Sequence, residues 1–536
     1  MKLDHLYQPY AAQRHTVFAR NGMVATSQPL AAQAGLDILK KGGNAIDAAI
    51  ATAAALTVVE PTSNGIGGDA FALVWAGGKL HGLNASGPAP QSISIEAVKA
   101  LGHEKIPVHG VVPITVPGVP ASWAELSKKF GKLPLTEVLE PAIRYAEEGF
   151  PLTPILGKYW KLAYNRFSEL FKKEEYQPWF DTFAPKGRAP EIGEMWSSPG
   201  HAASLRSIAE TNAESFYRGE LADKMADYVQ KYGGFLTKED LASYKVEWVD
   251  PISVNYRGYD VWEIPPNGQG IVTLMALQIT KGFRFMEKES VDTYHKHIEA
   301  MKLAFIDGKA YVTEESEMPV STRMLLSDEY ADARRTLIGE EAIDPEPFEL
   351  PKGGTIYLAA ADGEGNMVSF IQSNYMGFGS GIIPPGTGIT LQNRGVDFSM
   401  DENHPNVLRP GKKTFHTIIP GFLTKDGEPI GPFGVMGGFM QPQGHFQVVT
   451  NTIDFHLNPQ AALDAPRWQW IEGKKVLVEP GFPNHIAEAL IRRGHQIQKS
   501  VETGGFGRGQ IIWRDPESGV LMGGSESRTD ASIAAW

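Results

Sequence analysis

The character of the chain changes at Gly353-Gly354-Thr355-Ile356-Tyr357. Residues 345–354, which lead into this point, are polar and rich in proline and glycine, and they predict an exposed linker. The residues that follow predict a strand over 355–361, a hairpin loop over 362–366 and a return strand over 367–372. A threonine that opens a strand therefore directly follows a glycine pair that ends a linker.

The chain on either side of this junction differs in its predicted secondary structure. Before it, helices dominate residues 121–231, and the segment 23–78 predicts a strand, two helices and a strand, with Ser27 as the cap of the first helix. Further elements are predicted as a strand over 254–264 and helices over 290–306, 459–463 and 485–493. The pattern predicts a larger helical α/β part, residues 1–354, and a smaller β-rich part, residues 355–536.

Composition excludes several classes of protein. A hydrophobic content of 42% over 536 residues is ample for a buried core. The net charge of -12 argues against nucleic acid or an anionic membrane as a partner. Because the chain has no cysteine, disulfides, thiolate nucleophiles and cysteine metal sites are excluded. The first 20 residues contain no signal-peptide run, and Ala45–Val59 is too short to span a bilayer, so we expect a soluble, cytoplasmic protein.

Motifs for phosphate binding and for zinc catalysis are absent, since the chain has neither GxxxxGK[ST] nor HExxH. His295 and His297 are two positions apart on a predicted helix, so they diverge, and we expect both at solvated positions. The sequence therefore predicts neither a metal nor a cofactor.

Thr355 is the remaining candidate for covalent chemistry. Its hydroxyl is a weak nucleophile unless a base lies beside it. Cleavage of the chain before Thr355 would create an α-amine with a reference pKa of about 7.7 to 8.0, which can serve as that base. Gly353 and Gly354 tolerate the strained backbone that eases such a cut. The structural alternative is an ordinary threonine at the start of a strand.

A second glycine pair, Gly437-Gly438, lies in a segment, residues 435–444, that predicts a loop feeding a helix. Two adjacent backbone N–H groups in such a loop can form an oxyanion hole for acyl transfer. An ordinary glycine turn is the alternative. The residues of Thr355 and of this pair leave both the catalytic and the structural interpretation open.

Several longer motifs are similar to those of the γ-glutamyltransferase family. They are GMVA (22–25), GLDILKKGGNAIDAA (35–49), GGDAF (67–71), VPGVP (116–120), PAIRYAEEGF (141–150) and EAMKLAF (299–305). The chain resembles this family over nearly its whole length. The resemblance implies an N-terminal nucleophile hydrolase with an αββα four-layer sandwich.

The resemblance also implies the roles of individual residues. It implies self-cleavage between Gly354 and Thr355, which would give a large subunit of residues 1–354 and a small subunit of residues 355–536. Thr355 matches the nucleophile, and Ser373 matches the hydroxyl that steadies the new amine. Gly437 and Gly438 match the oxyanion hole, and Asp397 matches the acid that holds the substrate's α-ammonium. Family members cleave the γ-glutamyl amide of glutathione and related small molecules.

The sequence departs from the family pattern around the substrate. Ser86 stands where an arginine is expected to bind the α-carboxylate, and Lys412-Lys413 replaces a serine pair. Arg394 replaces a Gln or Glu that would share the α-ammonium, and Tyr375 replaces an Asn. The residues after Thr355 are Ile356-Tyr357 where the family usually has Thr-His. Because Arg394 is close to Asp397 in the chain, we expect it to neutralise that acid.

Three functions are compatible with this pattern. The first, favoured by family precedent, is a γ-glutamyl hydrolase or transferase that holds the carboxylate with Arg394, Lys412, Lys413 or His416. The second is an amidase of the same mechanism with another acyl group, such as a glutaryl-like or β-lactam side chain. The third is an uncleaved, non-catalytic binding protein, against which Thr355, Ser373 and the glycine pair argue. The residues leave the choice between the first two open.

Overall fold

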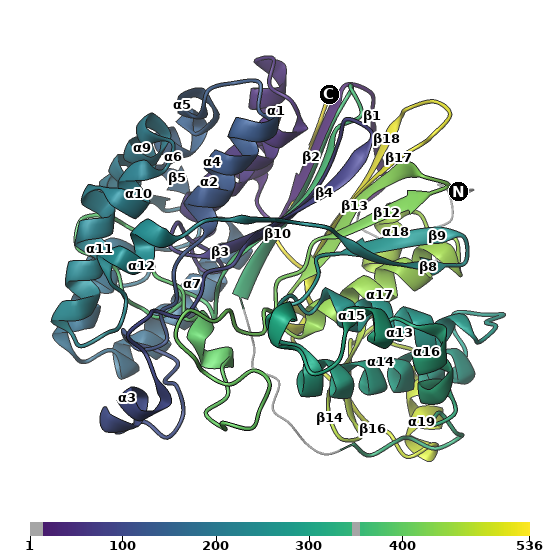
Figure 1. Ribbon diagram of the computed structural model, residues 1–536. Helices are drawn as coiled ribbons and strands as arrows, with labels where there is room; N and C mark the ends of the chain where they lie inside the picture. Colours follow the sequence, from purple (N-terminus) through teal and green to yellow (C-terminus); the bar gives the residue numbers. More distant parts are fainter. Residues whose placement is uncertain (1–13, 346–353) are drawn as a thin grey trace.

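The computed structural model of the protein describes residues 14–345 and 354–536. Two seven-stranded sheets lie face to face, and helices cover the outer face of each sheet (Figure 1). This arrangement confirms the four-layer αββα architecture. The predicted linker falls almost entirely outside the described residues.

The first sheet carries Thr355 in one of its inner strands. Its order is β19 (Ser532–Ala535), β2 (Gly22–Thr26), β10 (Gly354–Asp362), β11 (Met367–Tyr375), β3 (Asp69–Ala76), β4 (Lys79–Ala85) and β7 (Glu247–Val249). All neighbours are antiparallel. The β10–β11 register shifts between Gly354 and Ile356, so the pairing is irregular at Thr355. Such an irregularity bends a strand and can re-aim a side chain.

The second sheet packs against the first. Its order is β1 (Val17–Ala19), β18 (Leu521–Ser525), β17 (Arg508–Arg514), β13 (Glu428–Met436), β12 (Gly421–Lys425), β9 (Tyr259–Glu263) and β8 (Ile252–Tyr256). The single strand predicted over 254–264 is wrong, because Arg257 and Gly258 form a turn that makes a β8–β9 hairpin. Both turn residues have positive φ, 52° and 87°, which is the conformation of a tight hairpin.

The helices over the first sheet include the two predicted near the N-terminus, α1 (Pro29–Lys40) and α2 (Ala45–Val59). The predicted cap of α1 is wrong. The side chain of Gln28, not Ser27, accepts from the first N–H groups of the helix, and Ser27 instead donates to Glu60. The other helices on this side are α3 (Ile95–Ala100), α4 (Val119–Phe130), α5 (Leu135–Val138), α6 (Glu140–Glu148), α7 (Pro154–Leu170), α8 (Gln177–Phe183), α9 (Pro199–Thr211), α10 (Glu214–Arg218), α11 (Glu220–Lys231) and α12 (Lys238–Ser243).

The helices over the second sheet come from both sides of Thr355 in the chain. They are α13 (Gly270–Lys281), α14 (Val291–Tyr311), α15 (Thr322–Leu325), α16 (Asp328–Arg335), α17 (Met440–Ile453), α18 (Pro459–Asp464) and α19 (Asn484–Arg492). A small sheet lies beside them, formed by β14 (Trp468–Glu472), β15 (Lys475–Val478) and β16 (Gln496–Lys499). A two-stranded sheet pairs β5 (Phe150–Pro151) with β6 (Met195–Trp196).

Three large apolar clusters fill the three interfaces between the four layers. One packs α1 and α2 on the first sheet, and one packs α13, α14 and α17 on the second sheet. The third lies between the two sheets and includes Phe71, Tyr357 and Phe422. Both sheets combine strands from before and after Thr355. Because these contacts do not depend on the 354–355 peptide, a cut there leaves the two parts joined.

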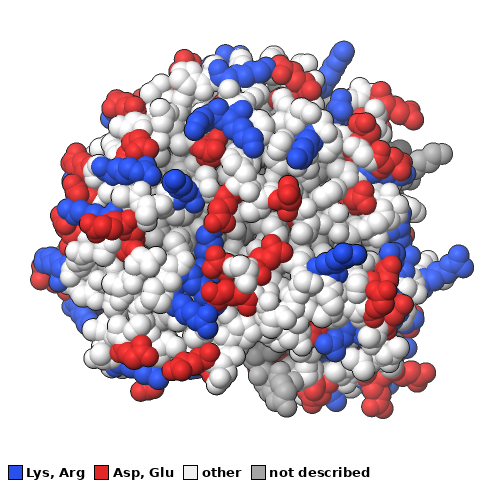
Figure 2. Space-filling view, in the orientation of Figure 1, with Lys and Arg blue, Asp and Glu red and all other residues white. Residues whose placement is uncertain are grey.

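The surface carries both signs of charge. Acidic and basic side chains are interspersed over the face shown in Figure 2, with no broad basic patch. Within residues 14–345 and 354–536, no helix is both long and apolar enough to cross a membrane.

Candidate active site

Thr355 lies at the start of β10, between β2 and β11, and its side chain is buried, with 1% of the residue exposed. Ser373 comes from β11, the hydrogen-bonded neighbour of β10, and its Oγ lies 3.1 Å from Oγ1 of Thr355. The pairing of β10 with β11 is irregular at Thr355, and the Gly354 carbonyl lies beside the Ser373 hydroxyl. Ser373 donates a hydrogen bond to this carbonyl oxygen over 2.6 Å. The scissile peptide predicted from the sequence is therefore held beside two hydroxyl groups.

The direction of these hydrogen bonds follows from the number of protons available. Ser373 has one O–H, which it donates to Gly354, and its oxygen accepts from the N–H of Tyr375 over 2.8 Å. The Thr355 hydroxyl is then the donor in its contact with Ser373. The chain of donors runs from Thr355 through Ser373 to the Gly354 carbonyl, which polarises that carbonyl and gives the Thr355 proton an acceptor.

Gly437 and Gly438 connect β13 to α17. Their φ angles are 138° and 59°, in the region that favours glycine. Within the described part of the chain, neither of their N–H groups donates a hydrogen bond. Gly434, three residues earlier, lies against the ring of Tyr357, which places this turn and the start of β10 at one end of the inter-sheet core. Two unused donors at the start of a helix suit a developing oxyanion.

Asp397 lies in a short 3₁₀ turn (Arg394–Asp397), and both of its carboxylate oxygens are engaged. Oδ1 accepts from the hydroxyl of Tyr375 over 2.7 Å, and Oδ2 lies 3.3 Å from Nη1 of Arg394. The guanidinium of Arg394 stacks over the Tyr375 ring at 4.0 Å. Tyr375 itself has φ 76°, which is uncommon for a tyrosine and aims its ring into this group. The ion pair expected from the sequence between Arg394 and Asp397 is present.

A second carboxylate that the sequence analysis did not single out lies behind Arg394. Asp69, at the start of β3, accepts from His416 Nε2 over 3.0 Å and lies 4.0 Å from Nε of Arg394. Burial raises the pKa of Asp69 to about 7, and the charge of Arg394 opposes that rise. Burial also lowers the pKa of His416 well below its usual value, so this histidine is a neutral donor. The GGDAF motif contained the signal, because a charged residue directly preceded an apolar strand.

The other residues considered for substrate binding, Lys412, Lys413 and Ser86, contact protein groups in the structure. Lys412 forms an ion pair with Glu317 at 2.7 Å, and Lys413 forms one with Glu247 at 2.6 Å. Ser86 donates to Asn84 over 2.7 Å. Because all three polar groups are already engaged outside the group formed by Asp397, Arg394 and Tyr375, they have little capacity for a substrate carboxylate.

One side-chain cluster has the composition of a metal site. His295, Glu299 and His495 offer ligand atoms within 4.8 Å of one another. The two histidines hydrogen-bond each other over 2.9 Å, and the Lys302 ammonium lies 2.7 Å from Glu299. The Lys302 ammonium provides the positive charge that a metal ion would otherwise bring to Glu299. We therefore assign the cluster a structural role. The expectation that His295 and His297 are solvated is wrong, since both are buried in α14.

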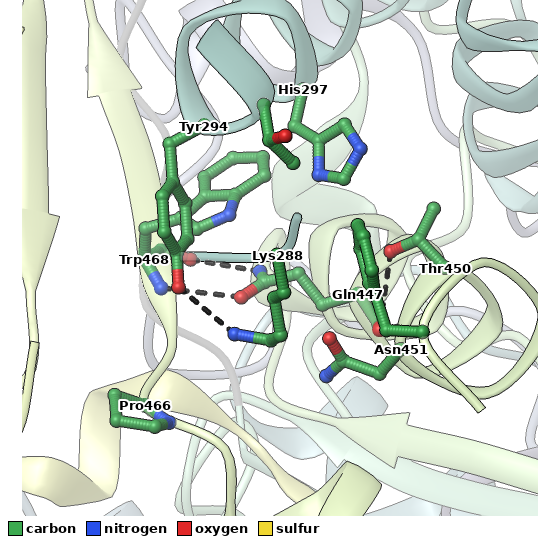
Figure 3. A pocket seen from close by; sticks show the side chains of 10 residues that line it. Lys288, Tyr294, His297, Gln447, Thr450, Asn451, Pro466 and Trp468 are labelled. Atoms are coloured by element: carbon green, nitrogen blue, oxygen red, sulfur yellow. Dashed lines mark hydrogen bonds between the residues drawn. The ribbon is translucent and has the colours of Figure 1, made fainter. Parts of the chain in front are cut away.

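Figure 3 shows a small cavity between α14, α17 and β14, lined by Lys288, Tyr294, His297 and Trp468 among others. Lys288 donates to the Tyr294 hydroxyl over 2.9 Å. The cavity has room for about one water molecule. Its lining includes none of the residues around Thr355 or Asp397, so it is not the acyl site.

Comparison with known proteins gives concordant results. A family model described as Gamma-glutamyltranspeptidase matches residues 31–536. The chain is 37% identical to a glutathione hydrolase-like YwrD proenzyme of Bacillus subtilis, over 96% of this chain and 99% of that protein. It is 33% identical to an oxamate amidohydrolase proenzyme of Klebsiella pneumoniae, over 96% and 98%. A crystal structure of cephalosporin acylase from Bacillus halodurans is 69% identical and superimposes with a TM-score of 0.96, over 100% and 99%.

Proposed function

The chain belongs to the gamma-glutamyltranspeptidase family, and from this premise we propose that it is a self-cleaving acylase. It cleaves itself before Thr355 and then hydrolyses amides of dicarboxylic acids whose acyl group carries no α-ammonium. The relatives named above as proenzymes support a precursor that gives two subunits.

Self-cleavage begins with the hydroxyl of Thr355. Its oxygen adds to the carbonyl carbon of Gly354 while its proton passes toward Ser373, which also donates to the carbonyl oxygen. The C–N bond then breaks, and the Thr355 nitrogen takes up a proton. Water hydrolyses the resulting ester and leaves a Gly354 carboxylate and a free Thr355 with its hydroxyl and α-amine.

Turnover of an external amide uses the same residue. The α-amine accepts the Thr355 hydroxyl proton as the oxygen attacks the substrate carbonyl. The N–H groups of Gly437 and Gly438 stabilise the oxyanion that forms. The leaving amine takes the proton, an acyl ester forms on Thr355, and water releases the acid. Apart from the substrate and water, these steps use only groups of this chain.

The Asp397 carboxylate is already paired, which supports a preference for acyl groups without an α-ammonium. An α-ammonium needs an unpaired carboxylate, yet Tyr375 occupies one oxygen of Asp397 and Arg394 lies on the other. A substrate cation would have to displace Arg394, and a charge-assisted hydrogen bond of this kind is worth roughly 1.5 to 3 kcal/mol. The 69% identity to a protein named cephalosporin acylase supports the same preference. The glutathione hydrolase-like relative supports the γ-glutamyl alternative.

The test compares kcat/KM for γ-glutamyl-p-nitroanilide and glutaryl-p-nitroanilide, which differ only in the α-amino group of the donor. We expect the wild type to cleave the glutaryl donor at least as well as the γ-glutamyl donor. Arg394→Gln should free Asp397 and shift the ratio about tenfold toward the γ-glutamyl donor. Arg409→Gln, at an exposed arginine that pairs with Glu317, is the control and should leave the ratio unchanged. A strong γ-glutamyl preference in the wild type, unaltered by Arg394→Gln, contradicts the proposal.

A further inference from the structure

Lys309 lies in the last turn of α14, and its ammonium packs against two aromatic rings. Nζ is 3.8 Å from the centre of the Phe439 ring and 4.3 Å from the centre of the Phe415 ring. The two rings are stacked on each other, with centroids 6.0 Å apart. The aromatic faces attract the cation but provide no hydrogen-bond acceptor of carboxylate strength.

The surroundings of Lys309 connect it to the proposed acyl site. Phe439 directly follows Gly438 of the glycine pair. Phe415 is two residues before Thr417, whose hydroxyl accepts from Arg394 over 2.7 Å. Burial lowers the pKa of Lys309 to about 8, and the charge of Asp397 opposes this fall. Three segments that carry active-site groups therefore meet around this ammonium.

Lys309 differs from the other cations near the site in having no anionic partner. Across residues 14–345 and 354–536, its Nζ forms no hydrogen bond and no ion pair. Lys412 and Lys413 are each paired with a glutamate, and Arg394 is 1% exposed and pairs with Asp397. The residue as a whole is partly exposed, while its ammonium is buried deeply enough to lower its pKa.

We propose that Lys309 binds the distal carboxylate of the acyl group, and so selects amides of dicarboxylic acids over amides of simple fatty acids. This inference rests on the proposed function, because it assigns a contact within the same acyl site. Arg394 and Asp397 neutralise each other, and Lys309 then supplies the positive charge that a glutaryl-like chain requires. The two rings cover the methylene part of that chain.

The test measures binding of glutarate and of butyrate to the cleaved wild-type protein by isothermal titration calorimetry. Lys309→Met should weaken glutarate binding about tenfold or more and leave butyrate binding unchanged. Lys309→Arg keeps the charge and should restore glutarate binding. Lys129→Met is the matched control. Lys129 belongs to α4, and its ammonium also lies over an aromatic ring, 3.4 Å from the centre of the Trp248 ring. It should change neither affinity.

A pH series separates charge recognition from a structural role. The ionisable groups that face Lys309 are Asp397 and His404. Glutarate affinity of the wild type should fall as the pH rises above about 8, because Lys309 loses its proton, whereas Lys309→Arg should not show this fall. Comparing the two proteins at each pH cancels titrations that they share.

The outcomes of the two proposals are distinguishable. If Lys309→Met binds glutarate as tightly as the wild type does, and glutaryl-p-nitroanilide is still cleaved, the role of Lys309 is wrong. The proposed acylase function then still holds. Wild-type protein that fails to bind glutarate also overturns it. Lysine-dependent glutarate binding without any Thr355-dependent turnover supports the carboxylate site and contradicts the proposed function.

Discussion

The Ser373 hydroxyl donates a 2.6 Å hydrogen bond to the carbonyl oxygen of Gly354, while its own oxygen lies 3.1 Å from Oγ1 of Thr355. One side chain therefore contacts both the attacked carbonyl and the attacking hydroxyl. The contact arises because β10 and β11 are adjacent and their register shifts at Thr355. Ser373 is thus placed to assist the proposed self-cleavage before any substrate is present.

Ser373→Ala should slow self-cleavage by about 10²-fold or more, because loss of one preorganised donor to a developing oxyanion typically costs about 10²–10³ in rate. The rate is measured by following the intact chain on denaturing gels after a shift from low to ambient temperature. Ser369→Ala is the matched control, since Ser369 lies on the same strand and contacts the Tyr357 hydroxyl at 2.8 Å instead. Equal cleavage rates in Ser373→Ala and Ser369→Ala would remove Ser373 from the mechanism.

The pH profile of kcat/KM should rise through neutrality. The Thr355 α-amine must be neutral to accept the hydroxyl proton, and its reference pKa of about 7.7 to 8.0 leaves it mostly protonated at about pH 6. The profile is measured with a p-nitroanilide donor on fully cleaved protein. A rate that is flat from mildly acidic to mildly alkaline pH would require a different base.

Asp69 should make stability depend on pH in the acidic range. Burial raises its folded-state pKa to about 7, above the value of an unfolded aspartate, so the folded state holds the proton more tightly. Its contribution to stability is therefore complete below about pH 4 and is lost as the pH rises to about 7.

The urea midpoint of the uncleaved Thr355→Ala chain, measured across this pH range, tests that sign. Adding Asp69→Asn should flatten the trend, because the amide does not titrate. Asp181→Asn, at an exposed aspartate, should leave the trend unchanged. A midpoint trend that Asp69→Asn does not alter contradicts the assignment.

Turnover should not depend on a metal ion. The α-amine supplies the base, and the His295–Glu299–His495 cluster already contains the Lys302 ammonium. Dialysis against EDTA, followed by assay of kcat, should change nothing. Activity that is lost on chelation and returns with a divalent ion would assign catalysis to a metal.

Local patterns in the sequence predicted the elements around the site, whereas tertiary contacts determined their partners. The strands on both sides of residues 362–366 and the Arg394–Asp397 ion pair could be predicted, because each depends on neighbours in the chain. The partners of Lys412 and Lys413 could not, since Glu317 and Glu247 lie far away in sequence.

The β8–β9 hairpin and the position of Lys309 could not be predicted either, for related reasons. Arg257 gives no turn signal by residue type, although Gly258 follows it, and its positive φ accompanies the antiparallel pairing of β8 with β9. Lys309 lies beyond the helix predicted over 290–306, and only the packing of Phe415 and Phe439 places it beside the site.

The central claim is that Thr355 becomes a new N-terminus and the nucleophile. Intact-mass spectrometry of purified protein over time tests it directly, with Thr355→Ala and Thr355→Ser in parallel. We predict a small chain of residues 355–536 that stays bound to residues 1–354, with Thr355→Ala whole and inactive. Thr355→Ser should retain some cleavage because it keeps a hydroxyl. A wild-type chain that remains whole while active, or a small chain that begins at another residue, contradicts the account.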